Sequence, residues 1–222
     1  MKPVERLGEA RTPDGSRLEL LRHDGAYLIR ANGIELMSSR RHLSEDRLAE
    51  VACSGRSAQP GIRAMIGGLG LGFTLRGALA TLRPDAEVVV AELMPQVVTW
   101  NRNASFVGLA AKELEDPRTK IVVDDVFAVL GKSGKYDAIM LDADNGTTAM
   151  MTAGNRALYE TRGLRVVHGA LNERGTVVYW SAANEDAFEQ LMRKEGFTTK
   201  VERVRAYGTG GPFHTLLLGR RS

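Results

Sequence analysis

The sequence has a single cysteine, Cys53, and it has no long hydrophobic run. One thiol cannot form an internal disulfide, and it offers no thiolate cluster for zinc. No apolar run reaches the ~20 residues that a membrane-spanning helix needs, and the first residues contain no apolar core of a signal peptide. These absences exclude a disulfide-built scaffold and argue against secretion or membrane insertion, so we expect a cytoplasmic protein.

The chain also has little excess charge of either sign. Its 222 residues carry a net charge of +3, with a pI near 9.1. Four arginines gather near the C-terminal end, and such a group is more often a solvated edge than a phosphate-binding surface. We therefore do not expect nucleic acid binding. No set of His, Asp and Glu residues has the spacing of a metal site, so we expect no metal.

The most informative segment is a glycine turn between two apolar runs. The run at 62–66 leads into Gly67, Gly68, Gly70 and Gly72, and a helical pattern starts directly afterwards. A second apolar run, at 87–91, ends in the acidic Glu92. Strand, glycine turn, helix, strand and acid together form the first half of a nucleotide-binding α/β unit. The glycines let the backbone approach a ligand, and the acid is placed to accept hydrogen bonds from ribose hydroxyls.

The spacing of these glycines favours a single nucleoside. A dinucleotide fingerprint needs a further glycine three positions after Gly70, and that position is Phe73. No lysine follows the glycines, so a phosphate-binding loop of the P-loop type is also disfavoured. We expect an adenosine-containing small molecule as the ligand.

Beyond this unit, apolar runs and helical patterns alternate. Further apolar runs occupy 120–123, 136–141 and 175–180, and the helical patterns occupy 73–82, 95–108, 155–172 and 185–196. Such alternation indicates a parallel sheet with helices on both faces. The last two runs, 198–204 and 213–218, are joined by too few residues for a helical crossover, so they should pair antiparallel. The predicted fold class is α/β, a Rossmann-like, mostly parallel seven-stranded sheet with an antiparallel C-terminal pair.

The N-terminal region has a different pattern. The Asp24-Gly25 and Asn32-Gly33 pairs lie between apolar segments and predict tight hairpin turns. Ser44 could cap a helix that runs to about residue 54. We therefore divide the chain into residues 1–54, a β-hairpin module plus a short helix, and residues 55–222, the Rossmann-like catalytic domain. The strand edges of the first part could pair in a homodimer.

Acidic residues follow three successive strands of the predicted sheet, and the glycine turn follows the strand before them. Ligands of open α/β sheets bind beyond the carboxyl ends of the strands. After the second strand comes Glu92, after the third Asp124 and Asp125, and after the fourth Asp142, Asp144 and Asn145. Packing alone does not explain acids at so many strand ends, so we interpret them as a functional site.

These motifs resemble the class I S-adenosylmethionine-dependent methyltransferases, and within them the spermidine synthase (aminopropyltransferase) family most closely. Residues 66–72 followed by Leu75-Arg76 are similar to that family's Ile-Gly-Gly-Gly-Asp-Gly-Gly and Leu-Arg. The family's later motifs resemble segments 91–94, 124–125, 142–146 and 207–210. The N-terminal module is similar to the β-domain that precedes the family's catalytic domain.

The resemblance implies roles for individual residues. The donor would be bound by Gly67, Gly68, Gly70, Gly72, Glu92, Asp124, Asp125 and Asp142. Among these, Glu92 would hold the ribose hydroxyls and Asp125 the adenine amino group. Asp142, with Asp144, would be catalytic, because an ammonium must lose its proton before it can attack the carbon of a sulfonium. The candidates for the acceptor pocket are Asn145, Tyr159, Trp180, Tyr207 and His214.

Position 70 departs from the family pattern. The family has an aspartate there, beside the reactive end of the donor, and this chain has Gly70. The loss favours a methyltransferase that uses S-adenosylmethionine on a small nucleophile such as an amine. The alternative is an aminopropyltransferase (polyamine synthase) that uses decarboxylated S-adenosylmethionine. An RNA methyltransferase and a non-catalytic nucleoside-binding module are further alternatives.

Overall fold

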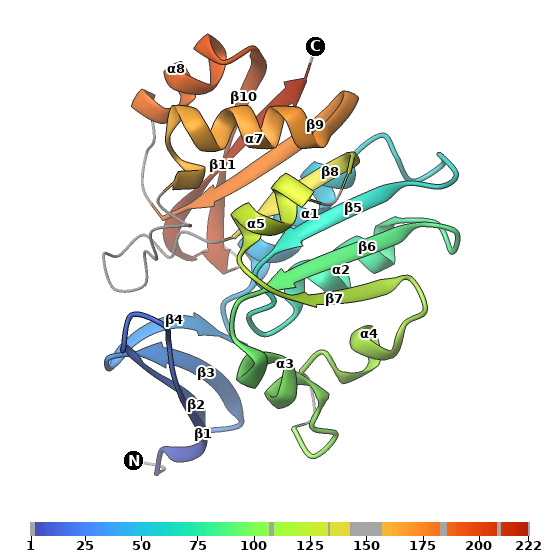
Figure 1. Cartoon of the computed structure of the whole chain (residues 1–222). Coiled ribbons are helices and arrows are strands. Elements are labelled where there is room, and N and C mark those ends of the chain that lie inside the picture. The colour runs from blue at the N-terminus through green and yellow to red at the C-terminus, as the bar shows by residue number, and fades with distance from the viewer. Residues whose placement is uncertain are drawn as a thin grey trace.

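The computed structural model describes residues 3–106, 109–132, 134–142, 157–182, 186–207 and 210–221, and it contains two sheets (Figure 1). The smaller one is an antiparallel meander of β1 (Glu5–Arg11), β2 (Arg17–His23), β3 (Ala26–Ala31) and β4 (Ile34–Ser38). Asp24 and Asn32 both have φ of 49° in the turns before Gly25 and Gly33. Tight hairpin turns need this left-handed conformation, so the predicted hairpins are confirmed.

The larger sheet has seven strands in the order β10-β11-β9-β8-β5-β6-β7. Their bounds are β5 (Arg63–Gly67), β6 (Glu87–Glu92), β7 (Thr119–Val123), β8 (Tyr136–Leu141), β9 (Leu171–Ser181), β10 (Phe197–Tyr207) and β11 (Gly210–Arg221). The strands from β5 to β9 pair parallel, whereas β11 pairs antiparallel with both β10 and β9. The predicted fold class is therefore confirmed.

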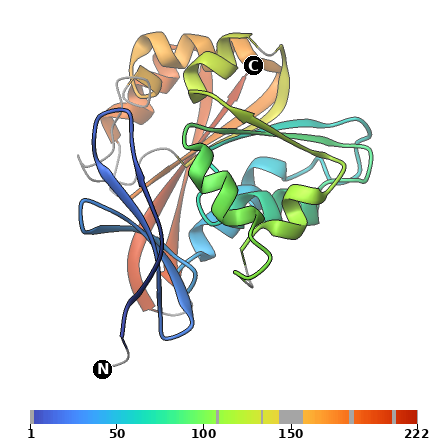
Figure 2. The ribbon, with the colours of Figure 1, turned by 60° about the horizontal axis from the view of Figure 1, so that its bottom comes forward.

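Helices cover both faces of the larger sheet (Figure 2). On one face lie α1 (Leu43–Cys53), α2 (Phe73–Thr81) and α3 (Pro95–Arg102), followed by the short α4 (Ala111–Glu115). On the other lie α5 (Val126–Lys132), α7 (Thr161–Ala170) and α8 (Asp186–Lys194). The first face shares its core with the smaller sheet, because buried side chains of β2 and β3 belong to the same apolar cluster as those of α1 and α3. None of the described helices is long and apolar enough to cross a membrane.

The order of the strands places a crevice beside β5. From β5 the chain continues to β6 and β7 on one side, and β8 and β9 then add on the other side. At such a switch point the loops that leave neighbouring strands diverge, and this opens a crevice at the carboxyl ends of the strands. The glycine turn and the segment after β8 both start at this edge.

Several predicted boundaries are wrong by a few residues. The helix at 95–108 ends at Arg102, because the side-chain oxygen of Asn103 accepts from the Ser105 N–H (3.0 Å) and this local turn competes with the helix. The helix at 155–172 ends at Ala170, and the next strand begins at Leu171 rather than 175 because the buried Leu171 already pairs with β8. Ser44 lies inside the first turn of α1 and makes no capping hydrogen bond.

Candidate functional site

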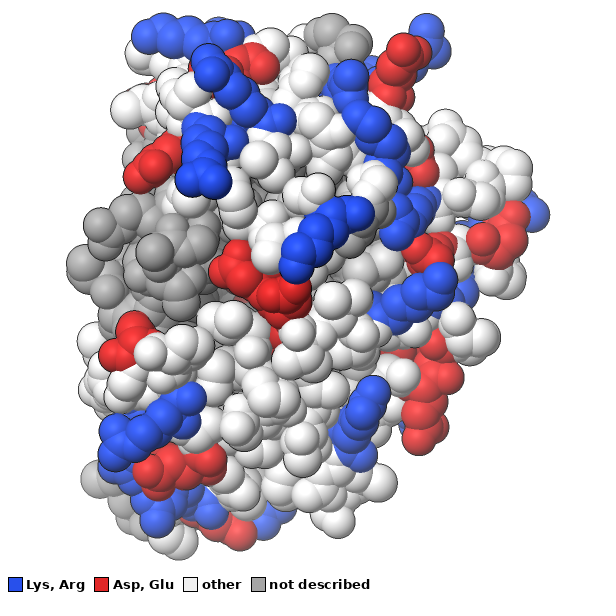
Figure 3. Space-filling view, in the orientation of Figure 1, with Lys and Arg blue, Asp and Glu red and all other residues white. Residues whose placement is uncertain are grey.

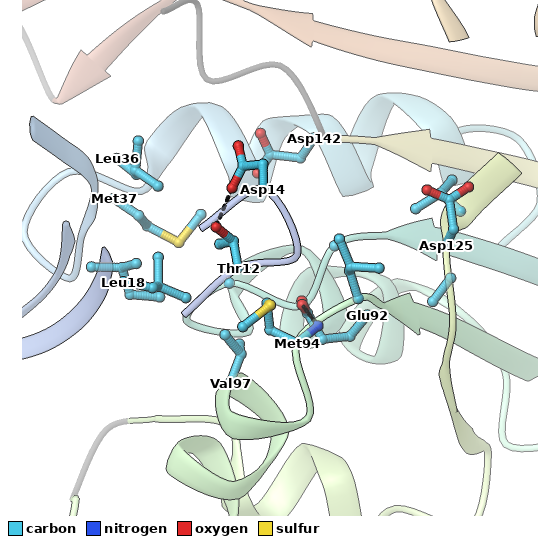
Figure 4. A pocket seen from close by; sticks show the side chains of 16 residues that line it. Thr12, Asp14, Leu18, Leu36, Met37, Glu92, Met94, Val97, Asp125 and Asp142 are labelled. Carbon is cyan, nitrogen blue, oxygen red and sulfur yellow. Dashed lines mark hydrogen bonds between the residues drawn. The ribbon is translucent and has the colours of Figure 1, made fainter. Parts of the chain in front are cut away.

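A cavity of about 130 Å³ lies between the two sheets, at the carboxyl ends of β5, β6 and β8 (Figure 4). A water molecule needs roughly 10–15 Å³ of such space, so the cavity has room for a small organic ligand. The smaller sheet and its β1–β2 turn form one wall, with Thr12, Asp14, Leu18, Ile29, Leu36 and Met37. The larger sheet forms the other wall, with Gly68, Gly70, Ala91, Glu92, Leu93, Met94, Val97, Asp125, Val126 and Asp142.

The glycine turn forms the cavity's floor. Gly68, Gly70 and Gly72 have φ of 95°, 52° and 83°, a region where a side chain is strained. Asn101 of α3, only 1% exposed, holds the turn in place. Its amide nitrogen donates to the Gly70 carbonyl (2.8 Å), and its side-chain oxygen accepts from the Ala110 N–H (3.2 Å). Sequence reasoning missed Asn101, although a polar residue among the apolar positions of a helix is a detectable signal.

Met37, from β4, lies directly over Gly70. The Leu71 N–H donates to the Met37 sulfur (3.1 Å). A Cβ built on Gly70 would come within 2.7 Å of both the sulfur and the methyl carbon of Met37. The space above position 70 is therefore filled by a thioether from the other sheet, and a side chain at this position requires Met37 to move.

Glu92 lies at the end of β6, faces the cavity and is 7% exposed. Its two carboxylate oxygens accept from the Leu69 and Met94 N–H groups, each at 2.8 Å. Burial raises the pKa of this carboxyl, and the backbone hydrogen bonds oppose that shift. The backbone N–H groups of Gly70 and Leu93 also interact with this carboxylate, so two ribose hydroxyls would share its oxygens with backbone donors. The ribose role of Glu92 is compatible with this geometry and stays a prediction.

The two acids after β7 lie differently. Asp125 lines the cavity, and its carboxylate also begins α5 by accepting from the Phe127 N–H (2.8 Å). Asp124 is not among the residues that line it. Its carboxylate accepts from the Asp125 N–H (2.8 Å) and pairs with Lys132 (3.3 Å), and these contacts lower its pKa. The donor-binding role predicted for Asp124 has no support from its position.

Asp142, the first residue after β8, also lines the cavity. Its N–H lies 3.4 Å from the carbonyl of Gly67, which ties the end of β8 to the glycine turn. Among the described residues that line the cavity are four carboxylates and no Lys, Arg or His. Figure 3 shows acidic side chains gathered near the middle of the face that Figure 1 presents. The site therefore attracts cations.

The fourth of these carboxylates, Asp14, comes from the turn between β1 and β2. The segment Thr12-Pro-Asp-Gly15 has the composition of a turn. Its local sequence pattern does not indicate that this turn lines a cavity together with the larger sheet. Figure 4 shows the carboxylates of Asp14 and Asp142 on the same side of the cavity.

The residues predicted for the acceptor pocket do not line this cavity where the structure describes them. The Tyr159 ring packs in the core of the opposite face, with centroid distances of 5.1 Å to Phe188 and 5.5 Å to Tyr179. Trp180 is buried and packs edge-on against His214 at 4.6 Å. Tyr207 ends β10, and its side chain lies outside the described part. Asp144 and Asn145 also lie outside the described residues, so their roles stay predictions.

His214 belongs instead to a polar cluster at the start of α1. Its Nδ1 lies 2.9 Å from the Ser44 hydroxyl, which donates to the Glu45 carboxylate at 2.5 Å. The Ser44 hydroxyl has one proton, so when it donates to Glu45 the Nδ1 of His214 is the donor to Ser44. Burial lowers the pKa of His214 and raises that of Glu45. Both groups therefore tend towards their neutral forms.

Glu45→Gln should stabilise the protein at neutral and alkaline pH. The pKa of Glu45 is higher in the folded state than in the unfolded state. The contribution of Glu45 to the free energy of unfolding is therefore full at pH values below the unfolded-state pKa, and it is lost as the pH rises through the folded-state pKa. A neutral amide keeps the Ser44 contact without the cost of burying charge. We expect a gain of about 0.5–2 kcal/mol at about pH 8 that shrinks towards zero near pH ~4.

Urea unfolding at a series of pH values measures this gain. The control is Glu50→Gln on the same helix, where the side chain is 56% exposed and should show no such trend. A gain that is the same at every pH would contradict the assignment to burial of the charge.

The described residues include no group of three or more His, Cys, Asp and Glu that could hold a metal ion. Cys53 is buried, and burial raises the pKa of its thiol to about 12. A thiol with this pKa stays protonated at neutral pH and is a poor nucleophile.

No protein-family model matches this sequence, and no curated protein matches it. Solved structures do match its fold. One is a spermidine synthase in complex with the transition-state analogue AdoDATO, with a TM-score of 0.75 and 18% identity, covering 98% of this chain and 73% of the other. Another is spermidine synthase from Thermotoga maritima, with a TM-score of 0.76 and 19% identity over the same shares. The chain thus has the fold of spermidine synthases.

Proposed function

We propose that this protein transfers an aminopropyl group from decarboxylated S-adenosylmethionine to a small amine. The observation that carries the proposal is the charge of the cavity, where the described lining holds four carboxylates and no basic side chain. The decarboxylated donor carries a sulfonium and an ammonium, both cationic. S-adenosylmethionine has an additional carboxylate, which these acids would repel. The fold of spermidine synthases over 98% of the chain supports the same choice.

The residues present suit the nucleoside part of this donor. Glu92 would hold the ribose hydroxyls, and Asp125 would accept from the adenine amino group. Val97 and Val126 offer apolar side chains for the faces of the base. The glycine turn lets the backbone approach without steric hindrance.

The reaction is a displacement at carbon. The nitrogen lone pair of the acceptor attacks the carbon next to the sulfonium, the carbon–sulfur bond breaks, and its electron pair stays on sulfur. The attacking nitrogen must be neutral, so a carboxylate beside it has to take or relay its proton. We assign that role to Asp142, because it lines the cavity at the switch point between β5 and β8. Positioning of the two reactants supplies most of the remaining catalysis.

Methyl transfer, which the sequence favoured, is the second candidate. The observation on its side is Gly70, with Met37 filling the space where an acid would hold the aminopropyl tail. The acidic lining argues against RNA as the acceptor, since phosphates would be repelled. A nucleoside-binding module without catalysis would bind the donor and show no turnover with any amine.

Calorimetry with the two donors tests the proposal. We expect the decarboxylated donor to bind at least about tenfold more tightly than S-adenosylmethionine, because each favourable or repelled charge contributes on the order of 1 kcal/mol or more at a desolvated site. Turnover is then measured with a panel of diamines by following the thioether nucleoside product. Tighter binding of S-adenosylmethionine, with methylated amines as products, would replace this proposal with methyl transfer.

A further inference from the structure

The structure assigns a donor-selecting role to Asp14: we propose that its carboxylate binds the ammonium of the donor's tail, in place of an acid on the glycine turn. This inference rests on the proposed function. The glycine turn has no acid of its own, and Met37 occupies the space above Gly70. The tail of a cationic donor therefore needs a carboxylate from another element.

Asp14 is fixed in place by its own turn. Thr12, which is 5% exposed, donates its hydroxyl to the Asp14 carboxylate, and the Ser16 N–H donates to the same oxygen at 3.1 Å. These hydrogen bonds, the one from Thr12 first, hold the pKa of Asp14 below its usual range. The side chain is therefore a fixed anion at neutral pH, and both described bonds involve only one of its oxygens.

The position of Asp14 suits the tail rather than the nucleoside. Glu92 and Asp125 line the part of the cavity at the ends of β6 and β7, whereas Figure 4 shows Asp14 on the side of Asp142. In the reaction the carbon next to sulfur must face the acceptor, and Asp142 marks the acceptor's side. A carboxylate near that end can bind the ammonium at the far end of a three-carbon chain.

The smaller sheet would thus carry both elements of donor choice. Met37 fills the space above the glycine turn, and Asp14 supplies a carboxylate from the opposite wall. Both belong to the β1–β4 meander, which is a separate sheet from the one that holds the glycine turn.

The test compares Asp14→Asn with the matched control Asp24→Asn. Asp24 lies at the other end of β2, in a tight turn with φ of 49° that asparagine also tolerates. Calorimetry is done with the decarboxylated donor and with methylthioadenosine, the neutral product that shares its nucleoside. We expect D14N to weaken binding of the decarboxylated donor about tenfold and to leave methylthioadenosine within about twofold, while D24N changes neither.

A relocation variant gives a second readout. In D14N, Met37→Ala removes the thioether above position 70, and Gly70→Asp then places a carboxylate on the glycine turn, where aspartate tolerates φ of 52° better than most residues. We expect the triple variant to recover most of the lost affinity for the decarboxylated donor and to lower its KM relative to D14N.

The outcomes separate the two proposals. If D14N weakens both ligands equally, or behaves like D24N, the assignment of Asp14 is wrong while the proposed function stands. If the wild-type protein prefers S-adenosylmethionine, the proposed function fails, and the assignment of Asp14 fails with it.

Discussion

Asp142→Asn is expected to lower turnover by roughly two to four orders of magnitude, the usual contribution of a general base. Asparagine has nearly the same shape and keeps the backbone contact with Gly67. It cannot take a proton, so an acceptor amine would stay protonated at the site. Donor affinity should stay within about fivefold, because three of the four carboxylates in the described lining remain.

Steady-state kinetics and donor calorimetry on the same preparation measure the two effects separately. Asp85→Asn serves as the control, since Asp85 precedes β6 at the opposite edge of the sheet and bonds to the Gly61 N–H at 3.2 Å. Full turnover in D142N would remove Asp142 from the mechanism. A loss of donor binding as large as the loss of turnover would make it a donor ligand instead.

Glu92→Ala is expected to weaken donor binding about 100-fold or more. Two hydrogen bonds from ribose hydroxyls to a buried carboxylate are worth about 1.5–3 kcal/mol each. The same substitution leaves the buried N–H groups of Leu69 and Met94 without an acceptor, at about 1–3 kcal/mol each. E92A should therefore also lose stability, and the loss of binding alone does not prove contact with the ribose.

Glu92→Gln resolves this, because the amide keeps one acceptor for the backbone. If Glu92 holds the ribose, the wild type should bind methylthioadenosine at least about tenfold more tightly than its 2′-deoxy form. E92Q should discriminate less than about threefold. Glu87→Gln, at the other end of β6 and paired with Arg63 and Lys120, is the control. Equal discrimination in the wild type and E92Q would mean that the ribose lies elsewhere.

The architecture could be predicted from the sequence because its signals are local. Apolar runs of strand length, alternating with helical patterns, are sufficient for a parallel sheet, and a short link between the last two runs requires an antiparallel pair. The glycines at 68, 70 and 72 have positive φ, which the sharp turn expected at these residues requires. Boundaries such as that at Asn103 shifted because a side chain's hydrogen bond to the nearby backbone outweighs helical periodicity.

Only part of the candidate site could be predicted from the sequence. Gly68, Gly70, Glu92, Asp125 and Asp142 line one cavity because the carboxyl ends of parallel strands share one edge. Trp180 and His214 were predicted for the acceptor pocket from their positions along the strands, which do not tell which way a side chain points. Their rings pack with each other and with the start of α1 rather than lining the cavity.

The sequence by itself determined the strands and helices of the larger sheet, the glycine turn and the acids at the strand ends, since each depends on residues close together in the chain. Only the tertiary structure decided what covers that edge. The smaller sheet places Met37 over Gly70 and Asp14 opposite the larger sheet. No periodicity encodes which surface of one sheet faces another, because that choice depends on the shared core of α1, α3 and the β1–β4 meander.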